Sequence, residues 1–173
     1  MEERLRFVFN NINEWLKFAE AKNAALVALN GAAAVAVLSL LKDSTKFAYT
    51  SKVCLLCSAA LSSLSLILAL LSMWPKCGIG LLRGYGTPRT GDNLLFWGDI
   101  AKYGRANKYL DALHSVCGSE PPSRRNEEYL YAEQIIQNSQ IAVRKYRVFV
   151  GSLALLLLAV LALVMAVVIE SWI

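Results

Sequence analysis

Residues 148–169 read VFVGSLALLLLAVLALVMAVVI, an apolar run of 22 residues without a charged side chain. The hydrocarbon core of a bilayer is about 30 Å thick, so a helix that rises about 1.5 Å per residue needs about 20 apolar residues to cross it. A large soluble protein could bury such a helix, but a chain of 173 residues is too short to surround one that is apolar on every face. This run is therefore predicted to be a transmembrane helix.

Two further apolar runs precede it, from Ala24 to Leu41 and from Val53 to Trp74, with the polar connection KDSTKFAYTSK between them. The chain is 56% hydrophobic and only 18% charged, whereas about a quarter of the residues of a soluble domain are charged. The predicted fold class is an all-α membrane protein with three transmembrane helices. The expected segments are an amphipathic helix (1–23), a first span (24–41), an outer loop (42–52), a second span (53–74), a central loop and helical region (75–147) and a third span (148–169).

The distribution of charge predicts the orientation in the membrane. The net charge is +5, and 11 of the 18 Lys and Arg residues lie between Pro75 and Arg147. Basic residues beside spans hold a loop on the cytoplasmic side, so the N-terminus and the central region are expected inside the cell. Lys42, Lys46 and Lys52 in the predicted outer loop count against this orientation but are fewer. A basic surplus can also indicate nucleic-acid binding, but topology accounts for it here, and no nucleic-acid partner is predicted.

The first and last spans are expected to continue as helices outside the membrane. Near the N-terminus one apolar stripe repeats at intervals of three and four residues and runs into the first span without a breaker, which predicts a single helix from Arg4 to Leu41. A similar stripe enters the last span, so a helix of about 45 residues should begin after a cap at Ser123 or Asn126. About 20 of these residues, or about 30 Å at about 1.5 Å per residue, should project from the membrane. The N-terminal stripe consists of Leu5, Val8, Ile12, Trp15 and Ala19.

The central region is expected to add one more helix. Asp92 is the predicted N-cap of NLLFWGDIAKYGRANKYLDALHSV, Asn93 to Val116. Gly98 and Gly104 either break this helix or let another helix approach it closely. Together with the projecting parts of the first and last helices it would form a small cytoplasmic bundle. Its predicted buried residues are Leu95, Ile100, Tyr103, Leu110 and Leu113.

Small residues mark helix-packing faces within the spans, because they let backbones approach closely in lipid. In the first span alanines recur every four residues and predict a face for a partner helix, and the amide of Asn30 is expected to bond another helix or to line a water path. In the second span serines form one seam, which either packs on the first span or lines a pore built by several subunits. The alanines are Ala24, Ala28, Ala32 and Ala36, and the seam is Ser58, Ser62, Ser65, Ala69 and Ser72.

The sequence carries no recognisable catalytic or metal-binding constellation. The only histidine is His114, and Cys54 and Cys57 form a CxxC inside an apolar run, where thiols behave as small hydrophobic side chains. The glycines of WPKCGIGLLRGYGTPRTGDN lack the pattern of a phosphate loop. Asp99 could be a general base, but a cap or an ion pair with Lys102 accounts for it better. Neither an enzyme nor a metal or cofactor is predicted.

Two motifs resemble those of a known family. AEAKNAALVALNGA, Ala19 to Ala32, and NLLFWGDIAKYGRANKYLDAL, Asn93 to Leu113, stand in the same order as the two signatures of the transmembrane effectors of the Pycsar anti-phage system. Glu20 stands where the family often has Asp, and Trp97 where it often has Phe. The two motifs, their spacing and the final span make the resemblance cover most of the chain.

The resemblance implies a bacterial effector that recognises cCMP or cUMP made by a partner cyclase. It would then impair the cell inner membrane, as an oligomer, so that the infected cell dies before phage is released. A cyclic nucleotide is a monoanion with one base, so its site needs a cation and a stacking or hydrogen-bonding edge. For each candidate, anchoring at the membrane interface or packing is the alternative role, and for the whole chain the alternative is a membrane adaptor that binds another protein. The candidate ligand-binding residues are Lys22, Arg83, Tyr85, Arg89, Asn93, Trp97, Asp99 and Lys102.

Overall fold

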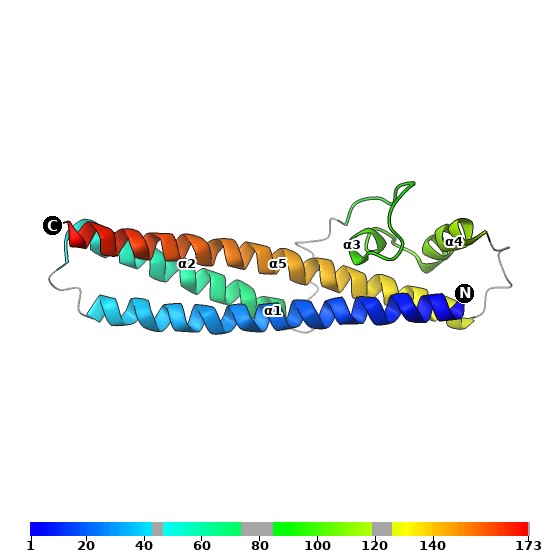
Figure 1. Cartoon of the computed structure of the whole chain (residues 1–173), viewed down its shortest axis with the longest axis horizontal. Coiled ribbons are helices and arrows are strands. Elements are labelled where there is room, and N and C mark those ends of the chain that lie inside the picture. Colours follow the sequence, from blue (N-terminus) through cyan, green and yellow to red (C-terminus); the bar gives the residue numbers. More distant parts are fainter. Residues whose placement is uncertain (43–46, 74–84, 119–125, 173) are drawn as a thin grey trace. The chain divides into compact units, whose positions relative to one another are not determined.

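A computed structural model describes residues 1–42, 47–73, 85–118 and 126–172 of the chain. Within these ranges it contains helices and no strand, which confirms the all-α prediction (Figure 1). The helices are α1 (Glu2–Lys42), α2 (Tyr49–Met73), α3 (Trp97–Ile100), α4 (Ala106–Cys117) and α5 (Asn126–Ser171).

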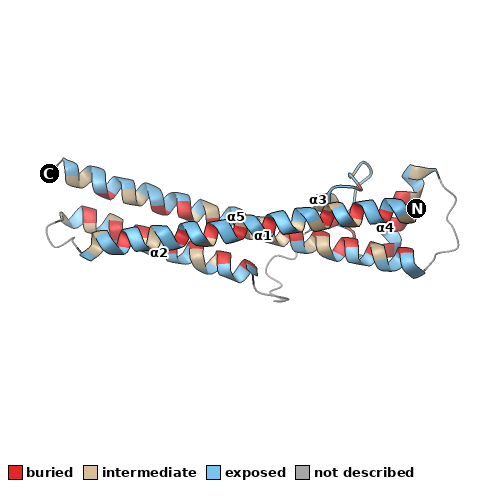
Figure 2. Ribbon diagram, turned by 60° about the horizontal axis from the view of Figure 1, so that its bottom comes forward, coloured by how far each residue is buried: buried red, intermediate tan, exposed pale blue. Residues whose placement is uncertain are grey.

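Helices α1, α2 and α5 are each long and apolar enough to cross a membrane, as predicted for the three spans. Only 17% of the most apolar stretch of α1 is buried inside the chain, with 28% for α2 and 22% for α5. Figure 2 shows the buried positions of these helices as narrow bands separated by exposed ones. Most of their apolar side chains therefore face outward, where lipid tails can cover them.

The two longest helices are continuous, as their uninterrupted stripes predicted. Helix α1 has 41 residues and α5 has 46. Each begins with two acidic residues in its first turn, Glu2 and Glu3 in α1 and Glu127 and Glu128 in α5, where a negative charge interacts favourably with the helix dipole.

The chain divides into two compact units, and both α1 and α5 contribute residues to each. Unit 1 comprises Met1–Glu20 and Gly78–Tyr146, and unit 2 comprises Ala21–Cys77 and Arg147–Ile173. Unit 2 therefore holds the apolar parts of α1 and α5 together with α2. Unit 1 holds the remaining parts of α1 and α5 together with α3 and α4.

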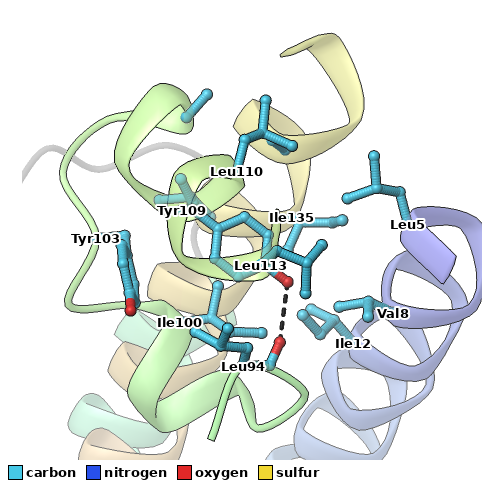
Figure 3. Close-up of a cluster of buried hydrophobic side chains, with 13 residues drawn as sticks. Leu5, Val8, Ile12, Leu94, Ile100, Tyr103, Tyr109, Leu110, Leu113 and Ile135 are labelled. Atoms are coloured by element: carbon cyan, nitrogen blue, oxygen red, sulfur yellow. Dashed lines mark hydrogen bonds between the residues drawn. The ribbon is translucent and has the colours of Figure 1, made fainter. Parts of the chain in front are cut away.

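Unit 1 has a hydrophobic core to which α1, α5 and the central region all contribute (Figure 3). Leu5, Val8 and Ile12 of the N-terminal stripe are fully buried there. Trp15 of the same stripe is 41% exposed. The central region supplies Leu94, Ile100, Tyr103, Ala106, Tyr109, Leu110 and Leu113, and α5 supplies Ala132, Ile135 and Ile136.

The residues from Asn93 to Val116 do not form one helix. The structure has the short α3 and the longer α4 instead, with Gly104 between them, so of the two roles left open for Gly104 it takes that of a break. The hydroxyl of Tyr109 donates a hydrogen bond of 2.9 Å to the carbonyl of Leu94 (Figure 3). In one straight helix these residues would stand about 22 Å apart, at about 1.5 Å per residue. Folding back at Gly104 thus brings both residues into one core.

This break also corrects two smaller predictions. Asp92 is not the N-cap of a long helix, because the helical residues begin at Trp97. Leu95 is 44% exposed, and its neighbour Leu94, only 9% exposed, takes the predicted place in the core. Helix α4 ends at Gly118, whose φ of 62° is the left-handed conformation that glycine adopts readily after a helix.

In unit 2 the serine seam of α2 is buried and its hydrogen bonds run to α5. Ser58 Oγ donates to the carbonyl of Ala159 at 2.8 Å, and Ser65 Oγ donates to the carbonyl of Ser152 at 2.7 Å. Ser152 Oγ in turn donates to the carbonyl of Ser65 at 2.6 Å. The packing predicted for this seam is thus present, but these bonds join the second span to the last one and not to the first.

The alanine face of α1 remains uncovered within the chain. Ala24, Ala28, Ala32 and Ala36 are all exposed. The buried face of the same helix consists of Asn23, Leu26, Asn30 and Val37. The side-chain amide of Asn30 donates to the carbonyl of Leu26 at 2.9 Å, a bond within its own helix.

Candidate functional site

The loop before α3 is folded around Lys102. Its ammonium lies 2.9 Å from Asp92 Oδ1 and 2.6 Å from Asp99 Oδ1, so the predicted ion pair with Asp99 is confirmed. Asp92 Oδ2 also accepts a hydrogen bond of 2.9 Å from the backbone amide of Arg89, and Asp99 Oδ2 accepts one of 3.0 Å from that of Asn93. We call Asp92, Asp99 and Lys102 the Lys102 cluster.

The charges of the Lys102 cluster satisfy one another. The hydrogen bond from Lys102, followed by that from the Arg89 amide, lowers the pKa of Asp92. The hydrogen bonds to Asp92 and then to Asp99 raise the pKa of Lys102. With two carboxylates around one ammonium, the cluster has a formal charge of −1. A phosphate approaching Lys102 would therefore meet two negative groups that already hold it.

Trp97 attaches α3 to α5 through an aromatic stack. Its ring lies 4.8 Å from that of Tyr146, with an angle of 10° between the planes. The ring of Phe96 also lies against that of Trp97, with 4.9 Å between the ring centres and 46° between the planes. The indole Nε1 of Trp97 is buried, and no described residue accepts a hydrogen bond from it. This stacked role matches the packing alternative that the sequence left open for Trp97.

The first motif contacts the start of the last span. Glu20 forms an ion pair of 2.6 Å with Lys145 of α5 in unit 1. Lys22 belongs to unit 2, where its ammonium lies 5.8 Å from the centre of the Phe149 ring. Further along unit 1, the amide of Asn138 donates to Asn13 Oδ1 at 2.8 Å. The two helices are thus joined by polar contacts in both units.

The structure brings together four of the predicted ligand-binding residues, Arg89, Asn93, Asp99 and Lys102. Trp97 belongs to the same segment, and Tyr85 is half-buried at its start. Lys22 is not part of this group because it lies in unit 2. Arg83 lies outside the described residues.

Sequence reasoning missed the residues that hold this region in place. Asp92 was expected as a cap, Lys145 only as one of the basic residues that set the orientation, and Tyr146 only as part of the stripe that enters the last span. Glu20 and Lys145 are 125 positions apart, so no local spacing pairs them. The run of charged and aromatic residues just before the third span was the one available signal that this turn of α5 has polar partners.

Of two cavities in unit 1, one is lined in part by Asp92 of the Lys102 cluster, and the lining of the other contains no residue of that cluster. One, of about 540 Å³, is lined by Arg4, Phe7, Asp92, Asn93, Leu95 and Val116 among others. The other, of about 410 Å³, lies where α4 begins and is lined by residues of α4 and α5. In the described ranges no group of three His, Cys, Asp or Glu residues is placed to hold a metal ion.

Comparison with known proteins gives the family. The family profile described as the Pycsar effector protein domain, PycTM, matches residues 4–170. The Pycsar effector protein PtPycTM of Propioniciclava tarda is 32% identical over 166 residues, which cover 90% of this chain and 75% of that relative. No solved structure matches the chain. The resemblance seen in the two motifs thus extends over nearly the whole sequence, and the chain belongs to the Pycsar effector family, a membrane protein family of anti-phage defence effectors.

Proposed function

We propose that this protein senses a cyclic pyrimidine nucleotide, cCMP or cUMP, made by a partner cyclase, and then impairs the bacterial inner membrane. It acts as a binding protein and not as an enzyme. The observation that carries this proposal is that α1 and α5 each contribute residues to both units. A ligand that favours one arrangement of these helices in unit 1 can thereby change their packing in unit 2.

The side chains of unit 1 support the sensing role. A cyclic nucleotide needs a cation for its phosphate and an edge or ring for its base. The loop before α3 presents the exposed Arg89 and Asn93, next to the aromatic pair Trp97 and Tyr146. Among the binding residues predicted from the sequence, Arg89 is an exposed cation of the described set, whereas Lys102 is engaged by carboxylates.

The low burial of the spans supports an oligomeric effector. Three helices are too few to enclose a wide pore, so several chains would have to assemble. The exposed alanine face of α1 offers a surface where helices can approach closely. We propose that the polar residues facing a pore in a rearranged assembly are those of the serine seam, Ser58, Ser62 and Ser65, together with Asn30.

The basic residues of the central region support the proposed orientation. With 11 of the 18 Lys and Arg residues between Pro75 and Arg147, unit 1 would face the cytoplasm. A partner cyclase releases its product there. The sensing unit and its signal would thus share one compartment.

Leakage from vesicles tests this function. The purified protein is reconstituted in vesicles of bacterial polar lipids loaded with a self-quenching dye, and cCMP, cUMP, cAMP or cGMP is added. We expect one pyrimidine nucleotide to release dye while both purine nucleotides leave it inside. Equal release with all four, or the same release without nucleotide, would contradict the proposal.

The exposed apolar side chains of unit 1 favour one second candidate, a membrane adaptor that binds another protein. Phe7 is 63% exposed and Val116 is 75% exposed, and both line the larger cavity. Apolar side chains gathered at one place on a surface are typical of protein interaction sites. This adaptor binds no nucleotide, so Phe7→Ser should abolish capture of the partner and no nucleotide should cause leakage, whereas the effector function predicts nucleotide-dependent leakage in this variant as in the unmodified protein.

A further inference from the structure

We propose that the nucleotide binds in the cavity at the start of α4, and that this cavity prefers cytosine over uracil. This inference rests on the proposed function and assigns its ligand to residues that are not among the candidates predicted from the sequence. The cavity has a volume of about 410 Å³, within the range of about 300–1,000 Å³ that small-molecule sites occupy. Its lining includes Arg105, Asn107, Tyr129, Glu133, Gln137 and Gln140.

The lining comes from two elements of unit 1. Arg105 immediately precedes α4, and Asn107 belongs to its first turn. Tyr129, Glu133 and Gln137 follow one another at steps of four along α5, so they share one face of that helix. Ile136 beside them is only 5% exposed and belongs to the hydrophobic core. The cavity thus has polar walls built on helices that the core holds in place.

The polar groups of this lining are available to a ligand. Among the described residues, none forms an ion pair with the guanidinium of Arg105, and none bonds the side chains of Glu133 or Gln137. Of the side chains that line the cavity, only that of Gln140 forms a hydrogen bond with a described residue: its Nε2 donates to the carbonyl of Ala101 at 3.3 Å. The ammonium of Lys102, in contrast, is held by two carboxylates at 2.9 and 2.6 Å. A phosphate therefore competes with fewer groups at Arg105 than at Lys102.

The types of side chain match the parts of a cyclic nucleotide. A guanidinium can bind two phosphate oxygens at once. The ring of Tyr129 is 41% exposed and can stack on a base. Glu133 provides a carboxylate, which accepts a hydrogen bond from the exocyclic amine of cytosine but would face the carbonyl oxygen of uracil. The single carboxylate in the lining is the reason for the preference for cCMP.

Calorimetry on the full-length protein in detergent tests the location. cCMP is titrated into the unmodified protein, into Arg105→Glu, and into the matched control Arg6→Glu, which makes the same charge change at an exposed arginine of unit 1 outside the cavity. We expect Arg105→Glu to weaken binding by at least about tenfold, the loss expected when a charge-assisted hydrogen bond is removed, and Arg6→Glu to bind as the unmodified protein does. Unchanged binding in Arg105→Glu, or equal loss in both variants, would overturn the assignment.

Two further titrations keep the inference separate from folding and from the proposed function. Circular dichroism shows whether Arg105→Glu folds. If it does not, Tyr129→Ala, which removes an exposed ring, takes its place and should weaken cCMP binding. Unchanged binding in Tyr129→Ala would count against the cavity. Glu133→Gln should reduce the ratio of cCMP to cUMP affinity, and an unchanged ratio would overturn the cytosine preference. If the unmodified protein binds neither cCMP nor cUMP, the proposed function itself fails.

Discussion

Lys102 is the residue on which the fold of the loop before α3 depends. It joins Asp92, ten positions earlier in the chain, to Asp99 within α3. The side chain of Asp92 is only 9% exposed. Removing the ammonium would leave two neighbouring carboxylates without their shared partner, and like charges at this distance repel one another.

Lys102→Met should therefore lower the melting temperature of unit 1 at neutral pH. The folded-state pKa of Asp92 is lowered, so its ion pair stabilises the fold above the ordinary pKa of about 3.9 and is lost as the pH falls through the lowered value. The raised pKa of Lys102 keeps the other half of the pair intact until the pH rises above about 10.4. Thermal circular dichroism between neutral and acidic pH measures the difference.

The difference in melting temperature between the unmodified protein and Lys102→Met should be largest at neutral pH and should shrink as Asp92 is protonated. Lys108→Met is the control, because Lys108 is an exposed lysine of α4 outside the cluster. It should change the melting temperature little at any pH. A Lys102→Met variant as stable as this control would show that the cluster does not hold the loop.

At the scale of elements, α2 and α5 are joined by reciprocal hydrogen bonds between Ser65 and Ser152. Each hydroxyl donates to the carbonyl of the other residue, at 2.7 and 2.6 Å. Hydrogen bonds between helices in a membrane contribute about 0.6–2 kcal/mol each. The seam is therefore a specific contact between two spans as well as a row of small residues.

Ser65→Ala should destabilise the protein by about 1 kcal/mol, the typical value for a hydrogen bond between helices in lipid. Ser63→Ala is the matched control, since Ser63 is exposed and its hydroxyl bonds the carbonyl of Ala59 in its own helix. Thermal unfolding in detergent measures both. Equal stability of the two variants would mean that the bonds to Ser152 contribute nothing.

The pore-lining role proposed for the same seam has its own test. Ser62→Leu with Ser65→Leu should abolish nucleotide-triggered leakage while cCMP and cUMP binding persists, because an apolar lining stops ion and dye passage. Leakage unchanged by both substitutions would exclude this seam from the pore. Ser63→Leu, on the exposed side of α2, serves as the control for added bulk.

The elements differ in how far sequence could predict them. The stripes of α1 and α5 recur over many turns, so local periodicity fixed both helices closely. Gly104 indicated a possible break between α3 and α4, but the bond between Tyr109 and Leu94 is a contact made only after the chain folds back, and spacing does not predict it. The ion pair of Glu20 with Lys145 is likewise tertiary. Residue spacing predicts a helix face, but it does not pair residues that meet only in the folded protein.

At the scale of the whole molecule, the largest uncovered feature is the outward apolar surface of the spans. The alanine face of α1 is exposed along its length, while its other face is buried through Leu26 and Val37. Lipid can cover the alanines, but a second helix packs on them more closely than lipid tails do. The proposed oligomer would use this face.

Ala28→Leu should shift the detergent-solubilised protein toward smaller assemblies, because a larger side chain holds the helices apart. Light scattering after size-exclusion chromatography measures the mass. Ala60→Leu adds the same bulk at an exposed position of α2 and should leave the mass unchanged. An Ala28→Leu variant that assembles as the unmodified protein does would place the subunit interface elsewhere.

Titration calorimetry on the purified full-length protein tests whether unit 1 recognises a cyclic pyrimidine nucleotide. cCMP, cUMP, cAMP and cGMP are titrated separately into the same preparation. We expect micromolar or tighter binding of a pyrimidine nucleotide, with cCMP bound more tightly than cUMP, and no heat of binding from either purine nucleotide. A folded protein that binds none of the four, or binds purines and pyrimidines alike, would contradict it.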